Sequence, residues 1–571
     1  MPKPGVHAHR TCTAASGLRA IKSGLRAIKE YSRKVGALTY LRVPDVCHVH
    51  YRRPVPAQHL DLRARESQQR LSESLRALRE ELDIRAAFPD VVLREAERAV
   101  AEHALPVADL RHLPFLTIDP PGSTDLDQAV CLLRSGQPGT GSAEYGSGYE
   151  VFYAIADVPL FVGPDGAIDA EGRLRGQTLY APDGRVSLHP EAIPEGAASL
   201  LPDQDRPAFV WHFRLDADAV VESATVSRAT VRSRRQLTYA EVQADIDAGT
   251  PDEQLTLLRD IGVRRIQQEL DRGGATLNLP RQEITYDGGR YGIITEPALP
   301  CEDWNAQISL LTGMAAAHLM LEGRIGILRT MPEPDDGALS KFRRQSEALG
   351  HAWPEDVPHG AFLRALDVTD PRQLALMHAA APLFRGAGYT AFDGEVPDAV
   401  VQSAIGAPYA HTTAPLRRLV DRFVLVTCAS LCAREDVPDW VRRALPQLNA
   451  LMASSNLTAS RLESGAMDAV QAALLSHRIG EAFSAVVLQG SPPEADEIGV
   501  ASGTQSPRSS GTVQVIAPPV GAKCYGELVA GERVIVILVE ADIPRRRLRF
   551  EVKPPDAPQR PADDPSAGPA G

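Results

Sequence analysis

The sequence contains no apolar run long enough to cross a membrane. Such a span needs about 18 or more mostly apolar residues in a row, and the 571-residue chain has no such run. The first residues, MPKPGVHAHRTCTAASG, show no apolar stretch behind a basic head, so we expect no secretory leader. These absences predict a cytoplasmic protein without a membrane partner.

Paired cysteines are also missing. The seven cysteines are scattered, their number is odd and no CxxC occurs, which does not suit a disulfide framework or a zinc site. Cys428 and Cys432 are four residues apart on an expected helix, and we interpret them as two buried thiols on one face. Cys47, His48 and His50 have no partner cluster nearby, so we do not expect a metal site there. A reducing compartment fits this pattern.

Aspartate and glutamate (73 residues) outnumber lysine and arginine (61 residues), and the net charge is −12. This excess of acid argues against a protein whose whole surface binds nucleic acid. A local basic channel stays open as an interpretation, because arginines cluster in RSRRQ (232–236), APLRRLVDR (414–422) and RRRLRF (545–550). Each cluster can equally be a solvated face. Aromatic residues make up 5% of the chain, so one near a motif carries information.

The length allows about three or four domains, and the patterns divide the chain into three regions and a tail. Residues 1–110 are predicted to be a mainly helical module. This region has SGLRAIK in tandem at 16–29 and an amphipathic helical pattern at 61–83. One interpretation is a module of helix-turn-helix type that binds RNA. Residues 111–475 alternate strand-like runs with longer helical runs, which predicts a mixed α+β domain. Residues 476–555 hold short strands that predict a small β-barrel, and 556–571 predict a disordered tail.

The segment 115–130 reads FLTIDPPGSTDLDQAV and concentrates acidic residues beside an apolar run. A turn at PPG brings the chain back, and Asp125 and Asp127 occupy alternate positions that point to one side of an extended segment. Asp119 can lie beside them after the turn. Converging carboxylates repel one another unless they are protonated or neutralised by a cation, and oxygen ligands favour Mg²⁺ or Mn²⁺. A solvated turn and a structural cation loop are the alternatives.

A second segment, PYAHTTAPLRRLVDR (408–422), has the signals of a helix start. The Thr-Thr pair and Pro415 predict a helix whose first turn contains Arg417, where an anion is favoured by the N–H groups and by the helix dipole. An arginine there is a good phosphate clamp. The alternative for Arg417 or Arg418 is an ion pair with Asp421 on the next turn.

These two segments resemble the signature segments of the RNase II/RNase R (RNB) family of exoribonucleases, in the same order and at a similar separation. The stretch RLRGQTLYAPDGRVSLHPE, which begins at residue 173, resembles the family's connection between them. The resemblance covers about 111–475, and the last region resembles the S-one-type OB fold that ends these enzymes. The fold class that this implies is α+β, with an RNB catalytic domain of sheet or barrel and surrounding helices, and a C-terminal OB-fold barrel.

The resemblance implies a 3′-to-5′ hydrolase of single-stranded RNA that releases nucleoside 5′-monophosphates and uses Mg²⁺ (with Mn²⁺ as an alternative). We expect the protein to be a monomer. Asp127 and Arg417 fall on catalytic positions. The metal-site positions are occupied by Asp119, Asp125, Asp127 and Gln128. The residues expected to contact RNA are Tyr180, Tyr239, Arg418, Arg545 and Arg547.

The chain departs from the family pattern at several positions. Gln128 stands where the family usually has a fourth aspartate, Asn278 lies near the position of an aromatic base clamp, and Gln307 replaces a common acid. Cold-shock domains are not evident before residue 110. Two alternative functions therefore stay open: a catalytically weak RNB homologue that binds RNA as a regulator, and a Mg²⁺-dependent phosphodiesterase with another substrate.

Overall fold

The described part of the chain comprises residues 60–61, 65–136, 148–277, 279, 281–287, 290–296, 298–490 and 509–554 of a computed structural model. All of these residues belong to one unit, Val55–Gly571. The tandem SGLRAIK repeat, the Cys47 group, Asn278 and the tail 556–571 lie outside the described residues.

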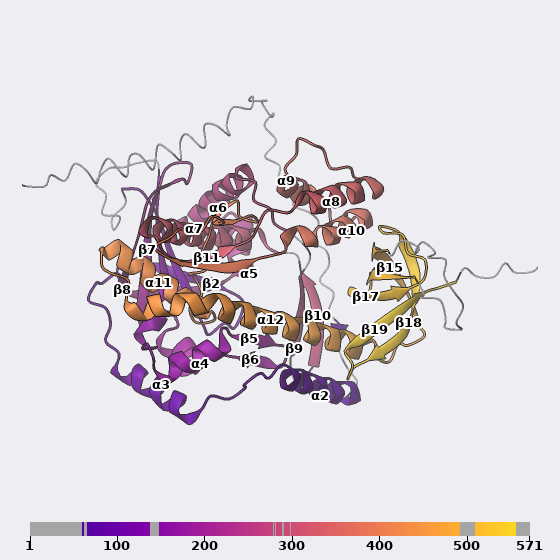
Figure 1. Cartoon of the computed structure of the whole chain (residues 1–571), viewed down its shortest axis with the longest axis horizontal. Helices are drawn as coiled ribbons and strands as arrows, with labels where there is room; N and C mark the ends of the chain where they lie inside the picture. The colour runs from indigo at the N-terminus through magenta and orange to yellow at the C-terminus, as the bar shows by residue number, and fades with distance from the viewer. Residues whose placement is uncertain are drawn as a thin grey trace, which may run out of the picture. The chain divides into compact units, whose positions relative to one another are not determined.

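A closed barrel is formed by strands β2, β3, β4, β7 and β8 (Figure 1). They span Phe115–Asp119, Gln128–Arg134, Tyr149–Ala156, Asp205–Leu215 and Val221–Thr238. β8 closes the barrel because it pairs antiparallel with β7 and parallel with β2, which puts Asp119 opposite Thr238. Aromatic and β-branched side chains suit such a buried pleated surface, and Tyr153, Trp211 and Phe213 belong to its core.

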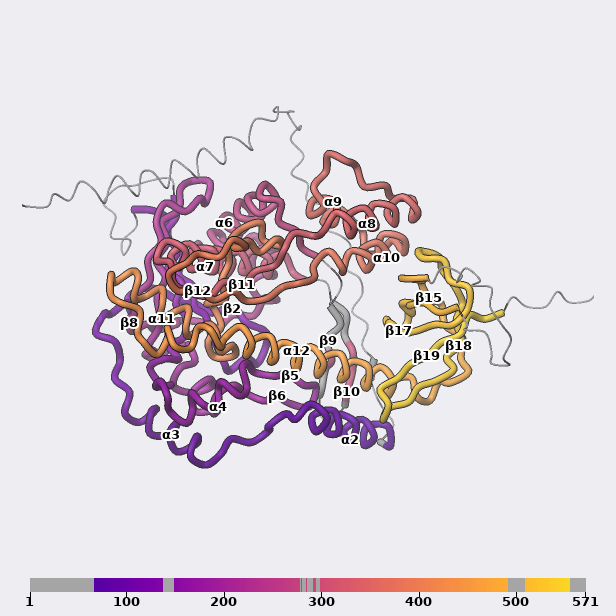
Figure 2. The backbone as a smooth tube through the Cα atoms, viewed as in Figure 1, coloured from indigo at the N-terminus to yellow at the C-terminus, as the bar shows by residue number. Residues whose placement is uncertain are grey.

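Long helices follow the barrel in the sequence and pack on it. Their bounds are α5 Tyr239–Asp247, α6 Glu253–Asp271, α7 Pro300–Gly323, α11 Leu419–Ala433 and α12 Asp439–Leu475. α6 packs on β3 and α7, and α11 packs on α7 and β8. The continuous apolar runs of α7 and α11 fit this burial on several sides. Figure 2 shows α12 running past β10 towards β19, and α12 contacts both strands.

Shorter elements connect these parts. Between β4 and β7 lie Val158–Leu160 (3₁₀), α4 Ala167–Arg175, β5 Leu179–Ala181, β6 Gly184–Val186 and Ala192–Ala197 (π). A small sheet joins β1 Leu60–Asp61, β10 Arg290–Glu296 and β9 Arg281–Asp287. The strand pairs β11 Ile325–Thr330 with β12 Gly388–Asp393, and β13 Val401–Gln402 with β14 Ala407–Pro408, lie later in the chain. A helical group packs around Phe342, Trp353 and Phe362: α8 Asp336–Ala348, α9 His359–Ala365, α10 Pro371–Ala379 and Ala381–Phe384 (3₁₀).

The C-terminal strands form a second closed barrel in the order β15-β16-β17-β19-β18. They span Ala482–Gln489, Ser510–Val515, Val520–Tyr525, Arg533–Asp542 and Arg547–Val552. β17 and β19 pair in parallel, and the other neighbours pair antiparallel. Five strands closed in this way are typical of an OB fold. The predicted fold class, α+β with a C-terminal OB-type barrel, is confirmed.

Two helices are described in the region predicted to be a helical module: α2 Arg65–Glu81 and α3 Asp90–Glu102. The amphipathic pattern at 61–83 correctly predicted α2. The helix-turn-helix interpretation stays a prediction, because most of that region lies outside the described residues. Within the described helices, none has the length and apolar character needed to span a bilayer. Cys428 and Cys432 are both free thiols: Cys428 is buried, as predicted, whereas Cys432 is only half-buried.

Candidate active site

The acidic loop connects β2 to β3. Asp119 is the last residue of β2, and Gly122 has a φ of 78°, a left-handed conformation that favours glycine. Leu126 anchors the far side, because its N–H donates to Ser199 Oγ at 2.9 Å and its carbonyl accepts from the Leu200 N–H at 3.0 Å. The loop is therefore held at both ends, and its carboxylates have defined directions.

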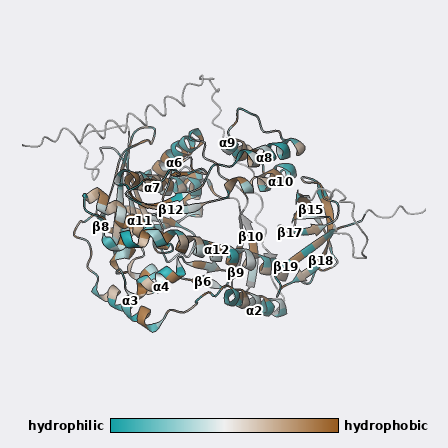
Figure 3. Ribbon diagram, viewed as in Figure 1, coloured by the Kyte–Doolittle hydropathy of each residue, from teal (hydrophilic) through white to brown (hydrophobic). Residues whose placement is uncertain are grey.

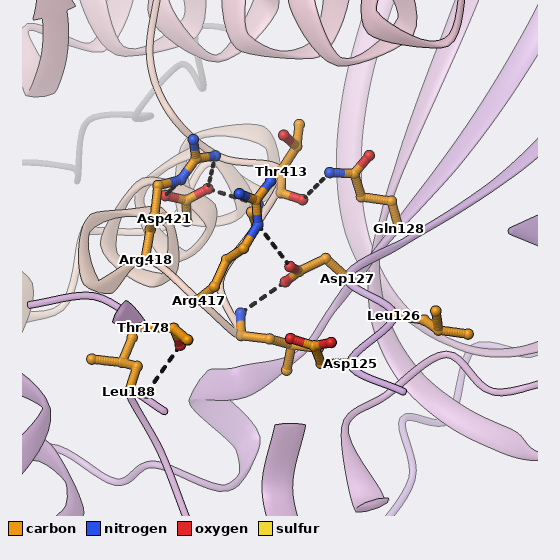
Figure 4. Close-up of polar contacts among 12 residues, drawn as sticks. Asp125, Leu126, Asp127, Gln128, Thr178, Leu188, Thr413, Arg417, Arg418 and Asp421 are labelled. Carbon is orange, nitrogen blue, oxygen red and sulfur yellow. Dashed lines mark hydrogen bonds and ion pairs between the residues drawn. The ribbon is translucent and has the colours of Figure 1, made fainter. Parts of the chain in front are cut away.

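Asp127 lies at the meeting point of the two sequence segments singled out above (Figure 4). Its side chain is 8% exposed; Oδ1 accepts from the Leu416 N–H at 2.8 Å, and Oδ2 lies 3.5 Å from Arg417 Nε. Burial raises the pKa of Asp127 to about 7, against the lowering effects of Arg417 and of the Leu416 N–H. A carboxyl with a pKa near neutrality is suited to exchange a proton.

Asp119 and Asp125 form the other part of the acidic loop. Oδ2 of Asp119 is buried and has no hydrogen-bond partner among the described residues. Burial, and next the charge of Asp125, raise the pKa of Asp119 to about 6. Asp125 Oδ1 lies 2.9 Å from Arg185 Nη1. A buried carboxylate with one unpartnered oxygen, beside a second carboxylate, would be stabilised by added positive charge.

The predicted convergence of three carboxylates is not observed. In the described part of the chain, no three His, Cys, Asp or Glu side chains are grouped closely enough to hold a metal ion by themselves. Asp125 faces Arg185 and Asp127 faces Arg417, so each of these two acids has its own basic partner.

Gln128 does not occupy the metal-ligand position that the sequence predicts. Its Nε2 donates to the Thr413 carbonyl at 2.7 Å, and its Oε1 accepts from Tyr153 Oη and from Ser309 Oγ, the latter at 3.2 Å. Figure 4 shows the Gln128 amide directed at Thr413, whereas Asp127 is directed at Arg417. Successive residues at the start of a strand point to opposite sides, which explains the difference. Gln128 thus connects β3 to α7 and to the segment before α11.

A test of this structural role replaces the Gln128 amide by an apolar side chain of similar size. Gln128→Met should lower the free energy of unfolding by about 1–3 kcal/mol, because the groups of Thr413 and Tyr153 lose their partner. The affinity for Mn²⁺, followed by electron paramagnetic resonance, should stay unchanged. Gln267→Met, at an exposed glutamine of α6 bonded to Asp271, is the matched control. A loss of Mn²⁺ affinity in Gln128→Met alone would restore Gln128 as a ligand.

The predicted helix start at Pro415 is wrong. α11 begins at Leu419, and Arg418 before it is extended (φ −131°, ψ 126°). The reason is a contact distant in sequence: the Thr178 N–H donates to the Arg417 carbonyl at 2.9 Å, and the Leu419 N–H donates to the Gly176 carbonyl at 3.0 Å. Arg417 therefore stands before the helix, and its place near Asp127 does not depend on a helix dipole.

The two arginines of this segment have different partners. Arg418 donates to Asp421 at 2.8 and 3.0 Å, and its side chain is 17% exposed, so the ion-pair alternative holds for Arg418. Asp421 also accepts from the Ala414 N–H at 2.7 Å, which holds the turn before α11. Arg417 is 45% exposed. Of the two, Arg417 is the one placed to meet a ligand, and RNA contact by Arg418 stays an untested prediction.

The two predicted aromatic contacts lie near the acidic loop. Tyr180 is in β5, is 52% exposed, and lies within electrostatic range of Asp125 and Arg417. Tyr239 is the first residue of α5, and its hydroxyl accepts from Asn305 Nδ2 at 3.2 Å. Burial, and to a smaller extent Asp119, raise the pKa of Tyr239 to about 12. Both side chains are thus brought to the acidic loop.

The predicted contacts in the C-terminal barrel lie on another part of the chain. Arg545 is in the turn between β18 and β19 and lies 3.5 Å from Asp542. Arg547 begins β19 and lies 3.6 Å from Glu540. Gln307 is buried in α7 and donates to Glu269 at 2.6 Å.

Sequence reasoning missed Arg185, which joins the β5–β6 hairpin to the acidic loop. Besides Asp125, it contacts Glu195 and lies 3.3 Å from Thr124 Oγ1. The Pro-Asp-Gly turn signal in YAPDGRV predicts such a hairpin, and pairing across it would have put Arg185 opposite Tyr180.

The residues that fit a divalent cation are Asp119 and Asp125. Mg²⁺ is commonly held by one or two carboxylates, with water and substrate phosphate as the other ligands, so a cluster of three acids is not required. The orphaned Oδ2 of Asp119 is the group that most needs such a charge. Gln128 does not fit, because its amide is bonded elsewhere.

Two segments of the chain match known protein-family domains. Residues 107–431 match the RNB domain, which is more than half of the chain. The chain belongs to the RNB domain family. Residues 481–553 match the RNase II-type exonuclease C-terminal S1 domain, which coincides with the second barrel. The family resemblance stated from the two motifs is confirmed.

The relatives of this RNB protein include nucleases of bacteria and eukaryotes. It is 28% identical over 235 residues to the human exosome complex exonuclease RRP44, covering 40% of this chain and 24% of the relative. It is 26% identical over 288 residues to ribonuclease R of Chlamydia trachomatis, covering 48% and 40%. The matched region is therefore less than half of either relative's length.

Solved structures share the fold. Mycoplasma genitalium RNase R in complex with ribose methylated single-stranded RNA matches with a TM-score of 0.71 at 18% identity, over 85% of this chain and 78% of the other. Yeast Ssd1, a pseudonuclease, matches with a TM-score of 0.55 at 15% identity, over 78% and 54%. The same architecture thus occurs in a nuclease and in a pseudonuclease.

Proposed function

We propose that this RNB protein is a divalent-metal-dependent exoribonuclease that shortens single-stranded RNA from its 3′ end and releases nucleoside 5′-monophosphates. The observation that carries the proposal is the position of buried Asp127. Its carboxylate accepts from the N–H of Leu416, which lies 289 residues later in the sequence, and faces the guanidinium of Arg417. A carboxyl with a raised pKa beside a half-exposed arginine offers a proton acceptor and a positive charge for a phosphate, both of which can serve phosphodiester hydrolysis. Family membership supports the same reaction.

The proposed roles follow from the contacts of each side chain. Asp119 and Asp125 would hold the Mg²⁺ or Mn²⁺ ion, which would neutralise charge on the scissile phosphate and activate water. Asp127 takes the proton of the attacking water on Oδ2, the oxygen that faces Arg417, while its Oδ1 is held by the Leu416 N–H. Arg417 contacts a phosphate oxygen and stabilises the charge that develops there.

The aromatic residues supply the proposed RNA contacts. Half-exposed Tyr180 can stack on any base, because every base has a π-face, and this suits a degradative enzyme. The Tyr239 hydroxyl, held by Asn305, is proposed to read the ribose 2′-hydroxyl. Arg545 and Arg547 on the second barrel are proposed to bind phosphates upstream. We further propose a monomer that works in the cytoplasm.

A second candidate function is an RNA-binding protein with a weak or retired site. The bonding of Gln128 away from the acids favours it, since one ligand position lacks a charge and the remaining acids do not form a cluster of three. The retention of Asp119, Asp125, Asp127 and Arg417 together favours the enzyme.

One experiment separates the two. The protein is incubated with a 5′-labelled single-stranded RNA and its DNA counterpart, in Mg²⁺ or in EDTA, and the products are resolved on a sequencing gel. We expect a ladder that shortens from the 3′ end on RNA only, lost in EDTA, with nucleoside 5′-monophosphates as the soluble product. Binding of RNA without shortening in either Mg²⁺ or Mn²⁺ would favour the regulatory candidate and overturn the enzyme.

A further inference from the structure

α2 makes a close contact with the hairpin that carries Tyr180. Arg79, in the last turn of α2, donates from Nη1 and Nη2 to the two oxygens of Asp183, at 2.6 Å each. The Arg79 and Asp183 side chains are 22% and 19% exposed. Two parallel bonds between a guanidinium and a carboxylate fix both distance and orientation, so this contact has more geometric specificity than a surface ion pair.

Asp183 lies in the turn that joins β5 to β6, and the hairpin leads directly into the candidate site. Tyr180 and Arg185 are paired across the two strands. Arg185 reaches Asp125 of the acidic loop at 2.9 Å. A continuous series of contacts therefore runs from Arg79 through Asp183 and the hairpin to Asp125.

α2 itself is held firmly at several points, so it can act as a fixed support. Leu71, Leu75 and Leu78 are buried in one cluster with α12, while Figure 3 shows hydrophilic residues elsewhere along α2. Ser74 Oγ donates to the Ile543 carbonyl at 3.0 Å, between β18 and β19. Glu81, the last residue of α2, lies 2.6 Å from Arg546, which is in the turn between β18 and β19.

We propose that Arg79 is a positioning residue for the RNA site, which holds the β5–β6 hairpin so that Tyr180 has its working orientation. Arg79 lies before the segment matched to the RNB domain, so the support comes from the part of the chain outside that domain. The proposal rests on the proposed function, because it assigns Tyr180 to RNA.

The test compares Arg79→Ala with a matched change on the same helix. Arg76 is exposed, and it lies 3.9 Å from Glu80 within α2 itself, so Arg76→Ala is the control. Arg79→Ala should raise the KM for a short RNA about tenfold, the size of a weakened base stack, with a change in kcat several times smaller. Arg76→Ala should change neither. All measurements are made well below the unfolding temperature of each variant.

Two further measurements separate positioning from loss of folding and from failure of the proposed function. Binding of a fluorescent RNA in EDTA, measured by anisotropy, needs no catalysis and should weaken by a similar factor in Arg79→Ala. The charge exchange Arg79→Asp with Asp183→Arg should recover part of the affinity that either single change loses. Equal affinities for Arg79→Ala and Arg76→Ala, or a doubly exchanged variant no better than the single ones, would overturn the proposal even if the protein hydrolyses RNA.

Discussion

Asp127→Asn should reduce the rate of RNA hydrolysis by about 10²–10⁴-fold, the usual contribution of a general base. Asparagine keeps the shape and the oxygen that accepts from the Leu416 N–H, so the loop should stay in place. It cannot take a proton. Burial raises the pKa of Asp127, which means that the folded protein disfavours its charge, so the neutral amide should leave the unfolding temperature unchanged or higher.

The measurement is single-turnover decay of a 5′-labelled RNA with enzyme in excess, together with RNA affinity and unfolding temperature. Asp165→Asn is the control, because Asp165 is an exposed acid paired at 3.3 Å with Arg443. The expected pattern is lost hydrolysis, retained RNA binding and a normal unfolding temperature. If Asp127→Asn hydrolysed RNA at a rate within a few-fold of that of the unsubstituted protein, Asp127 would not be the general base.

The largest effect on stability is expected at Arg422 in α11. Arg422 Nη2 donates to Asp169 Oδ1 at 2.6 Å, and the side chains are 0% and 2% exposed. Arg422→Leu leaves the Asp169 carboxylate buried with Arg173 as its remaining basic partner. Removing one member of a buried pair costs about 3–5 kcal/mol, because the desolvated charge that is left behind loses its compensation.

The free energy of unfolding is measured by urea denaturation, with tryptophan fluorescence as the signal. Arg443→Leu, whose pair with Asp165 is 62% and 75% exposed, is the control, and it should change stability by less than about 1 kcal/mol. If the two variants had the same free energy of unfolding, the buried ion pair between α4 and α11 would make no net contribution to stability.

The features that the sequence predicted well are those encoded in adjacent residues. Strands β2, β4, β7 and β8 follow from apolar and β-branched runs, and the acidic loop follows from its Pro-Pro-Gly turn. The amphipathic pattern of α2 has the expected 3.6-residue period, and α6 and α7 follow from long helical runs. The S1-type barrel follows from short strands separated by glycine, proline and serine.

The errors concern groups whose partners are distant in sequence. Gln128 has the composition of a ligand position, but Tyr153, Ser309 and Thr413 take up its amide, and no local pattern reports them. Likewise, the capping signals before Pro415 are local preferences for a helix start, yet residues 415–417 form a turn, and backbone pairing with Gly176 and Thr178 keeps Arg418 extended, so the helix begins only at Leu419. Local propensity loses to tertiary contacts at both places.

The pairing of Asp127 with the segment before α11 also has a consequence for the timing of biosynthesis. The two partners are 289 residues apart, and a ribosome adds about 5–20 residues each second, so the second partner follows the first by roughly 15–60 s. During that interval β2 to β8 can close their barrel, because all of its strands precede residue 239. A nascent chain of the proposed nuclease therefore carries its acids without Arg417, and cannot cleave the RNA around it until synthesis is well advanced.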